Sequence, residues 1–272
     1  SFDGSTMPHV LKRRIATGTP ADDHDFALSA GDIYFTFGPE NWASRTVGDE
    51  VMSPEPSFVG QTLNDVVLYK DRLTLLSRDS AVFSEVREPL NFWPTSIMSF
   101  VDSDPIDVQA ATTTDGVSNF HSGVATEAGL LLFTDSGQFL ARSGVQGPFT
   151  SRTVHIDQIS RYQSENISKP AFIGSRVYWV TEQGVNSKVW EYIVTSASGG
   201  GSFSGSATEV TGHVPRYLPR NIYKITGNDN ENIVCFFSRD EPKNIYVYQY
   251  LFSGNNRLQS AWSKWTFDQE IV

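Results

Sequence analysis

One short segment holds the residues of this chain that are best suited to chemistry. It reads LNFWPTS from Leu90 to Ser96 and, after a few residues, VDSDPIDV from Val101 to Val108. The segment sets an aromatic shelf beside three carboxylates, formed by Phe92, Trp93 and Pro94 and by Asp102, Asp104 and Asp107. Such a grouping could form a sugar-binding or sugar-cleaving cleft or a cation site, and it could equally mark the place where β-strands meet.

Sugar cleavage requires two carboxylates on either side of the scissile bond, commonly about 5 Å or about 7–9 Å apart. Asp102 and Asp104 could share one face of a strand at roughly 6 to 7 Å, because side chains alternate along a strand. That spacing arises by chance in many strands. The proline after Asp104 favours a tight turn, in which aspartate side chains accept hydrogen bonds from backbone N–H groups. We therefore predict a structural role for Asp102, Asp104 and Asp107, with catalysis as the alternative.

Other chemical motifs are missing from the sequence. An EF-hand is excluded because Ile106 occupies the third ligand position and neither the turn glycine nor the bidentate glutamate follows. The five histidines form no H-x-x-x-H pair, and neither G-x-S-x-G nor a phosphate-binding glycine loop occurs. Cys235 is the single cysteine, in the apolar run IVCFF, which is typical of a small buried hydrophobe. We expect no metal and no cofactor.

The elements that position these residues are expected to be strands. Aromatic residues make up 12% of the 272 residues, and Val, Ile and Thr are also frequent, which favours an all-β fold. The formal net charge of −10 argues against tight binding of nucleic acid over a broad face, although DNA could still slide past an acidic wall. No apolar run is long enough for a membrane-spanning helix, and no export signal is visible, so we expect no membrane anchor.

Four pairs of strand-like runs follow one another along the chain. They cover residues 66–86, 129–143, 175–194 and 232–252, with turns near 70–71 and 78–80, at 135–137, near 183–184 and at 239–243. Comparable early positions, Leu73, Leu130, Val177 and Ile233, lie 57, 47 and 56 residues apart. This spacing is close to the size of a β-propeller blade, about 40 to 50 residues, so we predict a propeller-like arrangement of antiparallel blades, with a β-sandwich as the alternative.

The chain divides into two parts by composition. Residues 1–53 are rich in Pro, Gly and Asp and contain one convincing strand, Asp32 to Phe37, so we predict a connecting arm or the edge of an adjoining domain. Residues 54–272 carry the propeller-like domain. Within it, SASGGGSFSGS at 196–206 is typical of a flexible loop. The sequence does not begin with Met, which hints that it belongs to something longer.

Several segments in order resemble the tail tubular protein B family, the tail-nozzle proteins of short-tailed bacteriophages. The resemblance is carried by the segments NWASRTVGDE, PSFVGQTLNDVVLYKDRLTLLS, FSEVREPLNFWPTS, DSDPIDV, GLLLFTDSGQFLA, VYWVTEQG, VWEY and QSAWSKWTF. It spans most of the chain. Asp71 departs from the family pattern, which has Asn in the turn before Arg72.

The resemblance implies a structural protein of the virion, made in the host cytoplasm. In this family about six copies form a nozzle ring at the distal end of the tail, below an adaptor and beside the tail fibres, and DNA leaves through its channel without specific binding. Its subunits are β-rich and propeller-like. A net negative charge suits the wall of a channel that should not retain DNA.

Within that picture we expect Phe92 and Trp93 to be buried anchors that close one blade onto the next, with the three aspartates fixing the turn before the following strand. Trp262 and Trp265 are expected to have the same packing role near the C-terminal end. Two other functions remain open, because propellers support all of them. One is a polysaccharide-degrading tail component that uses Asp102, Asp104 or Asp107, and the other is a module that binds glycans or a protein partner.

Overall fold

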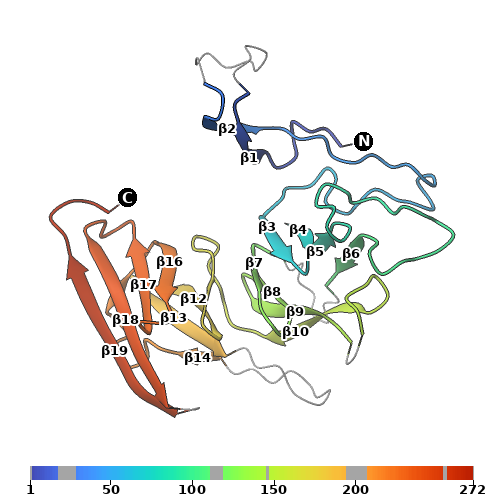
Figure 1. Cartoon of the computed structure of the whole chain (residues 1–272). Coiled ribbons are helices and arrows are strands. Elements are labelled where there is room, and N and C mark those ends of the chain that lie inside the picture. Colours follow the sequence, from blue (N-terminus) through green and yellow to red (C-terminus); the bar gives the residue numbers. More distant parts are fainter. Residues whose placement is uncertain are drawn as a thin grey trace.

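The computed structural model describes residues 2–17, 29–110, 119–144, 147–193, 207–253 and 256–271. These residues form nineteen strands and no helix, so the all-β prediction is confirmed. A two-stranded ribbon comes first, and four antiparallel sheets follow it in chain order (Figure 1). Across the described part of the chain, no helix is long and apolar enough to cross a membrane.

Each of the four sheets is built from one continuous stretch of chain. The first contains β3 (Asp65–Tyr69), β4 (Arg72–Ser77), β5 (Ser80–Phe83) and β6 (Ile106–Gln109), in that order. The second contains β7 (Ser122–Ala125), β8 (Leu130–Thr134), β9 (Gly137–Ser143) and β10 (Val154–Ser160).

The third sheet has a fifth, short strand. It contains β11 (Ala171–Ile173), β12 (Arg176–Gln183), β13 (Asn186–Ile193) and β14 (Ala207–Glu209), with β15 (Leu218–Pro219) also paired to β13. The fourth contains β16 (Ile222–Asn228), β17 (Ile233–Ser238), β18 (Asn244–Ser253) and β19 (Asn256–Thr266).

The predicted hairpins lie where the turn residues place them. Lys70 and Asp71 join β3 to β4 with φ angles of 49° and 58°, as the two central residues of a type I′ turn require. An Asn at position 71 would suit that left-handed conformation as well as Asp does. Gly184, with a φ of 63°, lies in the turn between β12 and β13. The tight turns explain why neighbouring strands in the sequence are also neighbours in each sheet.

The predicted repeat is confirmed at the level of single sheets. Leu73, Leu130, Val177 and Ile233 fall in β4, β8, β12 and β17, each the second strand of its sheet. The sheets run in chain order from the first to the fourth (Figure 1). Successive sheets share packed faces, which is compatible with propeller blades and with the sandwich alternative. Closure into a propeller ring stays a prediction, as does the division at residues 53 and 54. The loop predicted at 196–206 lies outside the described residues.

The inner sheets are buried on both faces. In β8, Leu130 and Leu132 pack towards the first sheet, while Leu131 and Phe133 pack towards the third. Strand β12 alternates in the same way, with Trp179 facing the second sheet and Tyr178 facing the fourth. Burial on both faces explains why runs such as LLLF are continuously apolar rather than alternating.

A buried carboxylate joins the third sheet to the fourth. The Glu191 side chain on β13 is completely buried and forms ion pairs with Arg176 of β12 and Arg257 of β19. Its second oxygen accepts a hydrogen bond of 3.0 Å from the Tyr178 hydroxyl. Burial, together with this carboxylate, raises the pKa of Tyr178 far above its usual range. The Arg176 guanidinium also lies over the Phe252 ring at 3.7 Å from its centroid.

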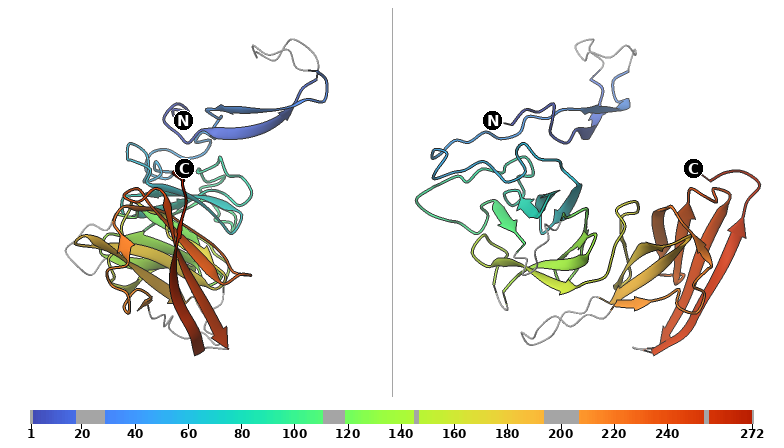
Figure 2. Two further views of the ribbon diagram at one scale, coloured as in Figure 1. Left: turned by 90° about the vertical axis from the view of Figure 1, so that its left-hand side faces the viewer. Right: turned by 180° about the vertical axis from the view of Figure 1, so that it is seen from behind.

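The ribbon consists of β1 (Val10–Ile15) and β2 (Ile33–Gly38). Only β2 was expected from the sequence, because VLKRRI carries three cations and lacks a plain apolar alternation. The ribbon stands off the body of sheets when the molecule is seen from different sides (Figure 2). Its pairing brings Leu11, Arg13 and Ile15 opposite Phe37, Phe35 and Ile33 on one face.

Candidate functional site

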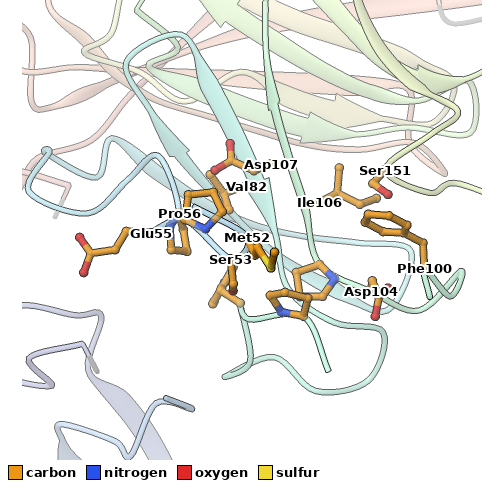
Figure 3. A pocket seen from close by; sticks show the side chains of 14 residues that line it. Met52, Ser53, Glu55, Pro56, Val82, Phe100, Asp104, Ile106, Asp107 and Ser151 are labelled. Atoms are coloured by element: carbon orange, nitrogen blue, oxygen red, sulfur yellow. The ribbon is translucent and has the colours of Figure 1, made fainter. Parts of the chain in front are cut away.

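A cavity of about 270 Å³ lies beside the first sheet, in the segment that the sequence singled out. Its walls come from residues 52–56, from β5 and the start of β6, and from the loop 84–105 that joins these two strands. Phe100, Asp104 and Ile106 stand on one side of the cavity, and Glu55 and Pro56 stand on the other (Figure 3). The lining is mainly apolar, and its charged residues are all acidic: Glu55, Asp104 and Asp107.

The loop 84–105 is held by one buried arginine. Arg72, the first residue of β4, is 1% exposed, and its guanidinium donates to four backbone carbonyls. These are the carbonyls of Ser84 (2.6 Å), Ser103 (3.2 Å), Asp104 (2.7 Å) and Asp102 (2.7 Å). Burial lowers the pKa of Arg72, and the nearby carboxylates of Asp104 and Glu85 oppose that shift. The planar guanidinium suits this task because its donors point in several fixed directions at once.

The three aspartates have three different roles. Asp104 is 4% exposed, and its Oδ2 accepts a hydrogen bond of 2.9 Å from the Val101 backbone N–H. It therefore closes the turn before β6. Asp107 lies within β6 and accepts hydrogen bonds from the backbone N–H (2.7 Å) and the hydroxyl (2.8 Å) of Ser57. Asp102 is exposed and is not part of the cavity lining.

This arrangement differs from the one that catalysis would need. Asp102 and Asp104 precede β6 and lie in a turn, so they do not share a strand face. Only Asp104 and Asp107 come together at the cavity, and both carboxylates accept hydrogen bonds from the protein itself. Within the described ranges, no group of three metal-ligating side chains is placed to hold an ion. The mainly apolar lining suits the packing of an apolar group. The Oδ1 of Asp104 is buried and accepts no hydrogen bond from the described residues.

Phe92 and Trp93 are each 3% exposed, but they do not lie between two sheets. Phe92 packs with Trp42 and Phe58 against the outer face of the first sheet. Trp93 stacks on Phe2 at a centroid distance of 5.3 Å. The expectation that they close one blade onto the next is therefore corrected: they fasten the N-terminal segment to the first sheet.

Replacing Trp93 by alanine should lower the free energy of unfolding by about 3 to 5 kcal/mol, because truncation of a buried aromatic ring removes packing and leaves a cavity. Equilibrium denaturation of the variant beside the unchanged chain measures this loss. Trp265→Ala is the matched control, since Trp265 is 44% exposed and its loss should change stability little. Equal losses in both variants would contradict a packing role that is specific to Trp93.

Trp262 and Trp265 have opposite orientations. Trp262 is half-buried against Phe236 and Tyr248, and its indole N–H donates to the Val210 carbonyl at 3.1 Å. It thus packs between the third and fourth sheets. Trp265 is exposed because residues three apart on one strand point to opposite faces. The expected packing role of Trp265 overlooked this parity.

Sequence reasoning missed Arg72, the residue that holds the loop beside the cavity. It was assigned no role, because it follows a turn, where an arginine is normally solvated. The alternation of side chains along the strand could have shown that Arg72 faces the core. Leu73 and Leu75 belong to the cluster on the outer face of the first sheet, so Arg72 has the same parity as the core-facing Thr74 and Leu76.

Comparison with known proteins gives two findings. A family model described as "Bacteriophage nozzle protein" matches residues 1–272. The chain is also 29% identical, over 266 residues, to the tail tubular protein gp12 of Escherichia phage T7. That similarity covers 98% of this chain and 31% of the relative, so the chain spans less than a third of the relative's length.

Proposed function

Because the chain belongs to the family of bacteriophage nozzle proteins, we propose that it forms part of the nozzle at the distal end of a short phage tail, through which the genome leaves the virion. The match over all 272 residues is the observation that carries this proposal. The similarity to a protein named for the tail tube of a phage points the same way.

The architecture suits a structural role. Four sheets with shared apolar faces form a continuous packed body, and charged side chains tie the third sheet to the fourth. The net charge of −10 suits a wall along which DNA must pass without being held. The partners of such a part would be further copies of itself in a ring of about six, an adaptor above it and the tail fibres.

Structural use of the carboxylates favours this role over polysaccharide cleavage. A glycosidase requires one carboxyl group that can protonate a leaving group and a second that acts as base or nucleophile. Asp104 closes a turn and Asp107 binds Ser57, so both are already engaged in holding the backbone. The cavity is accordingly assigned to binding rather than turnover.

Immunogold electron microscopy of purified virions tests the proposal directly. Antibodies raised against this chain should label the distal end of the tail, while antibodies against the capsid label the shell in the same preparation. Label confined to the capsid, or virions from which the chain is absent, would overturn the proposal.

A further inference from the structure

We draw no further inference here: the strongest candidate, the exposed apolar face of the ribbon formed by β1 and β2, carries none because nothing in the structure shows what covers it.

Discussion

Replacing Arg72 by alanine should lower the free energy of unfolding by about 3 to 5 kcal/mol, the range seen when one partner of a buried charged interaction is removed. The change removes the guanidinium donor from four backbone carbonyls of the loop 84–105, of which only the Ser103 carbonyl keeps another donor among the described residues, the Val86 N–H. Each buried acceptor without a partner costs about 1 to 3 kcal/mol, and relaxation of the loop towards water recovers part of that sum. Equilibrium unfolding in denaturant measures the loss.

Two further variants make the Arg72 experiment specific. Arg72→Lys keeps the charge but offers its donors from a single nitrogen, so it should recover only part of the lost stability. Arg87→Ala removes an arginine whose side chain is 82% exposed, and its stability should stay close to that of the unchanged protein. A loss for Arg72→Ala as small as that for Arg87→Ala would show that the loop does not depend on the guanidinium.

Glu191→Ala should be comparably damaging, with a loss of about 3 to 5 kcal/mol. The change leaves Arg176 and Arg257 close together without the carboxylate that neutralises them, and it removes the acceptor of the Tyr178 hydroxyl. Because these groups come from both sheets, the variant should loosen the contact between the third and fourth sheets. Denaturant unfolding measures the loss, and hydrogen exchange in β12 and β19 locates it.

The control for Glu191→Ala tests whether the loss of any glutamate carboxylate would have the same effect. Glu231→Ala changes an exposed glutamate in the turn before β17 and should leave stability nearly unchanged. A triple variant that replaces Glu191, Arg176 and Arg257 by apolar residues of similar volume should recover much of the loss, since a packed apolar cluster can replace a buried ion pair. If the triple variant were no more stable than Glu191→Ala, the loss would come from packing rather than from unpaired charge.

Much of the fold was predictable because it depends on local signals. Turn residues such as Asp71 and Gly184 fix where strands reverse, and the regular positions of Leu73 and Leu130 reveal the repeat of sheets. The ribbon was only half predicted, because its two strands lie far apart in the sequence and β1 carries Lys12, Arg13 and Arg14. Pairing across such a distance leaves no local trace in either strand.

The location of the site was predictable from the sequence, but the contacts that hold it together were not. An aromatic and acidic segment marked residues 90–108, and the cavity lies there. The role of Arg72 depends on which backbone carbonyls reach its guanidinium after folding. These carbonyls belong to residues up to 32 positions away in the sequence. The assignment of Phe92 to a contact between blades failed for the same reason, since Trp42 and Phe58 approach it from an N-terminal segment whose path the sequence does not reveal.

The construction of each sheet from one continuous stretch of chain has a kinetic consequence. A sheet can pair all of its strands as soon as its own segment has left the ribosome, since few of its hydrogen bonds wait for residues made later. The apolar face meant for the next sheet, such as the one with Leu131 and Phe133, stays in water until that sheet is synthesised. Synthesis therefore passes through a series of half-covered intermediates, and the aggregation hazard is greatest in the interval between one sheet and the next.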